Sequence, residues 1–79
     1  MSRQKRQIEI LGFLEEHEQA TRMEIHTGLN WPNWHITKSL ILSLSVMGLV
    51  QHEDKPKDPG LAKLFLTDEG REVLIEFGG

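Results

Sequence analysis

Two amphipathic segments separated by a short break, within residues 23–50, constrain the fold more than any other feature of this sequence. Thr21 and Glu24 have the spacing of a capping box, in which the hydroxyl accepts from the third helical amide and the carboxylate accepts from the amide of the cap. A helix is therefore predicted to begin at Arg22. Gly28 is expected to end it, because glycine readily takes the positive φ of a C-terminal cap.

The second segment predicts a helix from the turn to about Met47, capped by Asn30 or Asn33, with Pro32 in its first turn. Gly48 is expected to end this helix in the left-handed conformation. Apolar residues at helical spacing predict a buried stripe formed by Ile36, Leu40, Leu44 and Met47. Polar and aromatic residues open the helix on another side: Asn33, Trp34, His35, Thr37 and Lys38. One face of this helix can pack against the rest of the domain, while the other face is available to bind a partner.

Three further elements flank this pair of helices. Residues 3–17 place apolar side chains at helical spacing and predict a first helix. Residues 50–67 predict two strands joined by a long tip with two prolines and a glycine. Thr67 is expected to cap a last helix, whose apolar side is formed by Val73, Leu74 and Phe77. The expected fold class is α+β, mainly α.

A chain of 79 residues is expected to form one domain, residues 1–79. It has no cysteine, which excludes a disulfide or a thiolate metal site, and its histidines lack the spacing of a helical zinc pair. No catalytic Ser, His and Asp set and no glycine-rich phosphate loop emerge, so neither a cofactor nor enzymatic activity is expected. No apolar run approaches the roughly 20 residues of a membrane span, so a cytoplasmic protein without a membrane partner is expected.

The net charge of −3 disfavours binding to nucleic acid, but the charge is unevenly distributed. Arg22 and Lys38 against Glu24 give residues 21–48 a charge of +1. Residues 68–79 carry one basic and four acidic side chains, a charge of −3. The negative charge is therefore concentrated at the far end of the chain, away from the paired helices.

Three motifs, together with the order of the predicted elements, resemble the winged helix-turn-helix domain. They are EIHTGL at 24–29, LSLSVMGLV at 42–50 and LFLTDEGREVL at 64–74, which are similar to segments of MarR- and PadR-type transcriptional regulators. The resemblance covers essentially the whole chain. It implies a three-helix core with a short strand at 19–21, a β-hairpin wing and a C-terminal helix. It also implies that the helix opening at Asn33 enters the major groove of DNA, while the wing touches the backbone or the minor groove.

By this resemblance, nine residues are candidates for contacts with double-stranded DNA. Eight of the nine basic residues of the chain, all except Arg71, lie in segments that such a domain turns toward DNA. Arg22, Lys38 and the wing residues Lys55, Lys57 and Lys63 are expected to neutralise phosphates. Asn33, His35 and Thr37 are expected to meet base edges, and Trp34 to stack on a base or pack on a sugar.

The sequence departs from this pattern in ways that keep a second hypothesis open. The second helix of the pair carries only one basic residue, Lys38, and tryptophans at positions 31 and 34 surround the turn. Ile41 and Leu42 lie off the predicted stripe and are expected to be exposed. A winged helix with such a surface could instead serve as a protein-interaction module in a nucleic-acid or regulatory assembly, with a protein partner.

Three large apolar residues on the outer helices suggest a homodimer. Ile8, Phe13 and Ile75 lie beside the apolar residues that the core is expected to use, and are therefore predicted to remain partly spare. A shared patch buried between two copies would stabilise a two-fold symmetric dimer.

Overall fold

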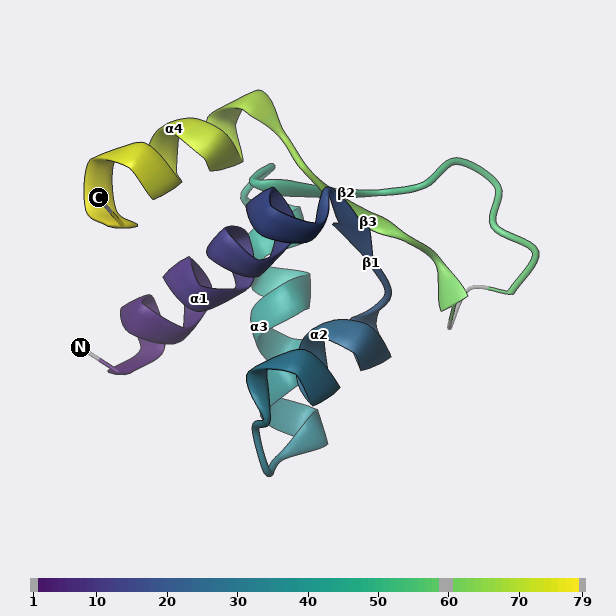
Figure 1. The fold of residues 1–79 in the computed structure, drawn as a ribbon. Coiled ribbons are helices and arrows are strands. Elements are labelled where there is room, and N and C mark those ends of the chain that lie inside the picture. Colours follow the sequence, from purple (N-terminus) through teal and green to yellow (C-terminus); the bar gives the residue numbers. More distant parts are fainter. Residues whose placement is uncertain (1, 59–60, 79) are drawn as a thin grey trace.

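Four helices and a small sheet make up the computed structural model, which describes residues 2–58 and 61–78 (Figure 1). In chain order the elements are α1 (Ser2–His17), β1 (Gln19–Ala20), α2 (Arg22–Leu29), α3 (Trp34–Val46), β2 (Val50–His52), β3 (Leu64–Leu66) and α4 (Asp68–Gly78). Helix α1 packs against α2, α3, α4 and β3. This arrangement confirms the predicted α+β, mainly α fold of the winged helix-turn-helix type. None of the helices in these two ranges is long and apolar enough to cross a membrane.

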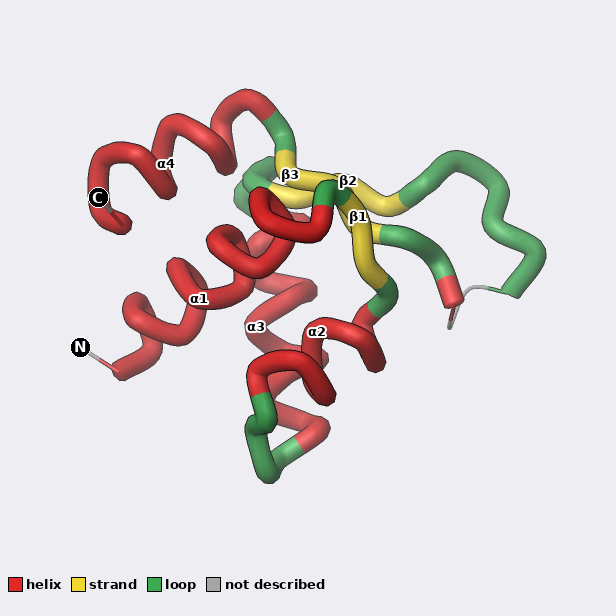
Figure 2. Tube along the Cα trace, in the orientation of Figure 1, coloured by secondary structure: helices red, strands yellow, loops and turns green. Residues whose placement is uncertain are grey.

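The sheet joins the start of the chain to the wing. Its strands are antiparallel in the order β1-β3-β2, with Ala20 opposite Leu64 and Val50 opposite Leu66. The predicted hairpin and the predicted short strand before α2 are both present. In Figure 2 the loop that joins β2 to β3 extends away from the helical part of the molecule, as expected of a wing.

The core lies between the first three helices and the sheet. Its buried apolar side chains are Ile10, Leu11, Leu14, Ala20, Ile25, Leu40, Ile41, Leu44, Val50 and Leu64. Full burial of each large aliphatic side chain contributes about 1.5–3 kcal/mol. Residues from α1, α2, α3 and all three strands of the sheet meet in this one cluster, so the relative placement of the helix pair and the wing is fixed by shared packing.

Helix α2 starts as predicted and ends differently. The Glu24 amide donates to the Thr21 hydroxyl at 3.1 Å and the Thr21 amide donates to the Glu24 carboxylate at 2.8 Å, which confirms the capping box. The left-handed C-cap is Asn30, with φ 56°, rather than Gly28. Asparagine tolerates this conformation better than most residues. Gly28 lies inside the helix, where a Cβ would overlap the ring of Phe13, so glycine is required at this position.

Helix α3 uses a different face from the one predicted. Thr37, Leu40, Ile41 and Leu44 are buried, whereas Ile36 is 38% exposed and Met47 is 51% exposed. The predictions that Ile36 and Met47 belong to the stripe, and that Ile41 is exposed, are therefore wrong. Apolar residues occur around most of this helix, so helical spacing alone fits more than one face. Packing against α1 and α2 selects the face that is buried.

A hydrogen-bonded junction fixes the end of α3 against the start of α4. Gly48, with φ 77°, ends α3 as predicted. The Thr67 hydroxyl donates to the Gly48 carbonyl at 2.6 Å and accepts from the Gly70 amide at 3.0 Å, which confirms Thr67 as the cap of α4. A Cβ at position 70 would overlap the Leu49 carbonyl oxygen, so glycine is required there. The GLV segment at 48–50 and the LTDEG segment at 66–70 therefore contact each other and connect the end of α3 to the start of α4.

The outer helices do not present the shared apolar patch that was predicted. Ile8 and Phe13 are half-buried and pack against the core, so they are not spare in the single chain. Ile75 is 70% exposed, and it lies on the side of α4 turned away from Val73 and Leu74, which pack on the core. Phe77, predicted to be part of the apolar side of α4, is mainly exposed. Dimerisation itself stays a prediction.

Candidate nucleic-acid interface

The turn between α2 and α3 is held by its own backbone and by one side chain. The Trp31 amide donates to the carbonyl of His26 at 3.4 Å, which closes the end of α2. Asn33 is the N-cap of α3, and its Oδ1 accepts from the His35 amide at 2.9 Å and from the Ile36 amide at 3.3 Å. Pro32 therefore precedes the cap instead of lying in the first turn. Because Oδ1 is used by the cap, the predicted contact of Asn33 with a base would depend on its amide nitrogen.

Thr37 is inside the protein, which corrects its predicted role at base edges. Its side chain is fully buried, and its hydroxyl donates to the Asn33 carbonyl at 3.3 Å. The same oxygen lies 2.7 Å from Nδ1 of His26, with which it shares a hydrogen bond. Thr37 therefore joins α3 to α2 and cannot reach a groove without unfolding this contact. Its partner on α2 was not identifiable from the sequence.

The two tryptophans at the turn make different contacts. Trp34 is half-buried, and its ring meets that of His26 edge to face, with centroids 5.1 Å apart. Trp31 packs against the core. The guanidinium of Arg6 lies 5.7 Å from the centroid of the Trp31 ring, a cation–π contact that brings a basic residue of α1 to the turn.

The outward ridge of α3 combines polar and apolar side chains. His35, Lys38 and Ser39 are exposed in its first half, and Leu42 and Val46 follow in its second half. Positions 35, 39, 42 and 46 recur every three to four residues and so lie on one line along the helix. This line is opposite the buried face formed by Leu40, Ile41 and Leu44. The exposure of Leu42 is as predicted.

Helix α3 and the turn before it carry no carboxylate, and the one acidic residue of α2 is Glu24 in its first turn. Between Glu24 and Glu53 the sequence contains no aspartate or glutamate, although the chain has 12 acidic residues. Helix α3 therefore exposes the Lys38 ammonium without any acidic neighbour on the same helix. Sequence reasoning noted the unequal charge of the two ends but missed the length of this acid-free stretch, which was visible in the sequence. Such a surface suits a negatively charged partner.

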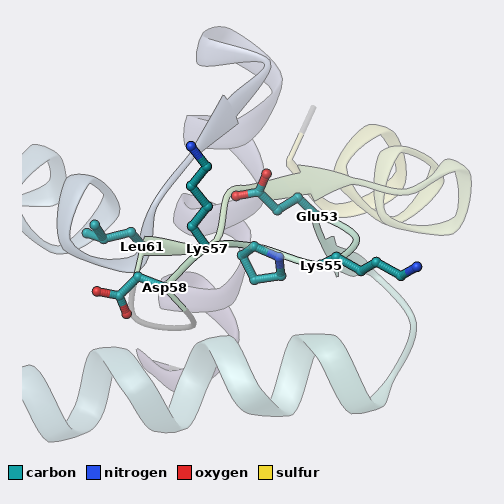
Figure 3. A pocket seen from close by; sticks show the side chains of 6 residues that line it. Glu53, Lys55, Lys57, Asp58 and Leu61 are labelled. Atoms are coloured by element: carbon teal, nitrogen blue, oxygen red, sulfur yellow. The ribbon is translucent and has the colours of Figure 1, made fainter.

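The tip of the wing carries two exposed lysines. Lys55 and Lys57 line a surface hollow of about 400 Å³ together with Glu53, Pro56, Asp58 and Leu61 (Figure 3). In this view the two ammonium groups point in different directions, the Glu53 carboxylate lies between them, and the Asp58 carboxylate lies on another side of the hollow. The tip therefore combines two lysines with two carboxylates.

Lys63 is placed at the base of the wing. Its ammonium forms an ion pair with Glu24 at 3.6 Å, and its amide donates to the Glu53 carboxylate at 2.9 Å. The hydrogen bond from the Thr21 amide, followed by the charge of Lys63, lowers the pKa of Glu24 below its ordinary value of 4.5. Lys63 thus links the wing to the first turn of α2, where Arg22 is half-buried. Part of its positive charge is already compensated by Glu24.

Transcription regulators of the MarR type are among the proteins of known structure that share this fold. A point mutant of MarR from E. coli, complexed with operator DNA, superimposes with a TM-score of 0.76 over 89% of this chain, at 18% identity. A point mutant of S. aureus MepR, bound to an oligodeoxyribonucleotide, gives a TM-score of 0.78 over 91% of this chain, at 23% identity. The PcaV transcriptional regulator from Streptomyces coelicolor, in complex with its natural ligand, gives 0.77 over 91%, at 24% identity.

The match covers about half of each of these proteins, namely 49%, 53% and 50% of their lengths. No protein-family model and no curated protein sequence matches this chain. At such identities the likeness establishes the fold. The class defined by the fold is a winged helix domain resembling those of MarR-type transcription regulators.

Proposed function

We propose that this chain is a transcriptional regulator domain that binds double-stranded DNA sequence-specifically. In this proposal α3 enters the major groove and the wing contacts the backbone or the minor groove. The fold is that of regulators whose structures contain operator DNA or an oligodeoxyribonucleotide. Helix α3, with 13 residues, is about 20 Å long, and the major groove of about 12 Å width admits a helix.

The observation that carries the proposal is the absence of aspartate and glutamate from residues 25–52. In a chain with a net charge of −3, this leaves α3 with no acidic side chain of its own to repel phosphates. Lys38 on α3 and the wing lysines Lys55 and Lys57 are exposed and supply positive charges. Phosphate contacts of this kind position a protein on a duplex without specifying a sequence.

Four other predicted contact residues would supply further contacts with bases, phosphates and sugars. His35 is exposed in the first turn of α3, where it can donate a hydrogen bond to a base or a phosphate. Arg22 and Lys63 flank the start of α2 and would neutralise phosphates, although Lys63 must share its charge with Glu24. Trp34, half-buried against His26, would contribute a sugar contact through its exposed edge.

The proposed assembly is a homodimer on a two-fold symmetric site, acting in the cytoplasm and without enzymatic activity. The solved relatives are transcription regulators, which supports a regulator and not an enzyme. Two copies would present two α3 helices to half-sites about one helical turn of DNA apart. Ile75 of α4, exposed on the outer surface, is the remaining candidate for the contact between copies.

A protein-interaction module is the second candidate function. Leu42 and Val46 are exposed on α3, and exposed apolar residues on one helix face are typical of protein interfaces. Against this, a histidine stands at the other end of this face with a lysine beside it, and Ile41, which was expected to be exposed, is buried.

Selection of bound sequences from a random duplex pool tests the proposal. A sequence-specific dimer enriches a palindrome with half-sites related by two-fold symmetry. A pool that shows no enrichment at low salt would contradict sequence-specific binding and favour the protein-interaction module.

A further inference from the structure

Leu42 and Val46 form an exposed apolar pair that the phosphate and hydrogen-bonding contacts do not explain. Leu42 is 64% exposed and Val46 is 79% exposed. They are four residues apart, so their side chains stand next to each other on one face, one helical turn apart. Neither packs against the core, which α3 meets with its opposite face.

The surroundings of the pair identify the chemistry of its occupant. Ser39 and His35 continue the same line toward the start of α3, and Lys38 stands beside it. No acidic residue occurs on α3 or in the turn before it. An apolar pair continuous with an acid-free, partly basic ridge is complementary to a polyanion that carries apolar groups. In the major groove of DNA the apolar group at the base edges is the C5 methyl of thymine.

The spacing of the pair agrees with this occupant. Four residues of α-helix advance about 6 Å along the helix axis. Successive bases on one strand are separated by about 3.4 Å. Two side chains about 6 Å apart therefore match base positions that differ by one to two steps, depending on the angle between α3 and the groove.

We propose that Leu42 and Val46 determine specificity by contacting the C5 methyl groups of two thymines in each half-site. This inference rests on the proposed function, since it applies only when α3 lies in the major groove. Asn33 and His35 then supply the polar part of the recognition from the first turn of the helix, and the apolar pair supplies a preference for thymine from the second half.

Replacing thymine by deoxyuridine tests the methyl contact, because it removes the methyl group and keeps every hydrogen-bonding group. The probe is the duplex selected by the wild-type protein, with each thymine of one half-site replaced in turn. Two replacements, one to two base steps apart, are expected to weaken binding by roughly fourfold each, the effect of one methyl-sized group. The Leu42→Ser, Val46→Ser double variant is expected to lose this discrimination while keeping the salt dependence of the wild type.

Met47→Ser is the matched control, because Met47 is also exposed but lies about 100° around the helix from Val46. It is expected to keep the preference for thymine. Equal binding of thymine and deoxyuridine duplexes by the wild type overturns the inference and leaves the DNA-binding function intact. A wild-type protein that binds no duplex overturns both the inference and the proposed function.

Discussion

Replacing Thr37 by valine tests whether this residue stabilises the contact between α2 and α3 or contacts the bases of DNA. Valine has nearly the same shape, so the substitution removes the hydroxyl and little else. The hydroxyl makes a 2.7 Å hydrogen bond with His26 and a 3.3 Å hydrogen bond to the Asn33 carbonyl, and the side chain is fully buried. A net contribution of about 0.5–1.5 kcal/mol for each bond, with the longer one weaker, gives a loss of about 1–2 kcal/mol.

The assay for Thr37→Val is thermal unfolding followed by DNA binding at a temperature where the variant is folded. The melting temperature is expected to fall by about 4–8 °C for each kcal/mol lost, as for other domains of this size. The affinity of the folded variant for the selected duplex should stay within about twofold, because a buried hydroxyl makes no base contact. Thr27→Val, an exposed position on α2, is the matched control and should leave both quantities unchanged. Unchanged stability together with a lost affinity would refute the structural assignment.

Three further predictions concern the wing, the capping box and α4. Lys55→Glu with Lys57→Glu is expected to weaken duplex binding while the melting temperature hardly changes, because both side chains are exposed; binding that survives this double reversal would remove the wing from the interface. The lowered pKa of Glu24 makes its contribution to stability complete above its ordinary pKa of 4.5 and lost as the pH falls through the lower pKa of the folded state. Glu24→Gln should remove that part of the pH dependence in unfolding curves recorded between neutral and acidic pH, and identical curves would contradict the charge-dependent contribution of Glu24. Ile75→Glu is expected to yield a monomer in sedimentation analysis, with weaker DNA binding because one half-site no longer recruits the other; a wild-type monomer at high concentration would contradict the dimer.

Local signals in the sequence were sufficient for the ends of most elements. The capping box of Thr21, the positive φ of Gly48 and the cap at Thr67 depend on residues within a few positions of each other, so the sequence contains the whole interaction. The hairpin was predictable for the same reason, since a loop rich in proline and glycine separates two short apolar runs.

Contacts between distant segments were not predictable from the sequence. Thr37 was assigned to the exposed face because its partner, His26, belongs to another helix. Phe13 was considered spare because nothing in the sequence shows that Gly28 leaves space for its ring. The buried face of α3 was predicted wrongly for a related reason. Ile36 and Ile41 are equally apolar, and only the packing of α1 and α2 against α3 distinguishes them. The order of the helices and strands was therefore predictable from the sequence, while the orientation of individual side chains required the tertiary structure.

The salt dependence of duplex binding, measured for the wild type and for Lys38→Ala, tests the central claim most directly. Binding through Lys38 and the wing lysines predicts that the logarithm of affinity falls linearly with the logarithm of salt concentration, with a slope of about −3 to −4 for each chain. Lys38→Ala should weaken binding to all duplexes alike and reduce the steepness of this slope by about 1 unit. An unchanged slope would place Lys38 outside the interface, and the absence of duplex binding at low salt would contradict the proposal that this winged helix binds DNA.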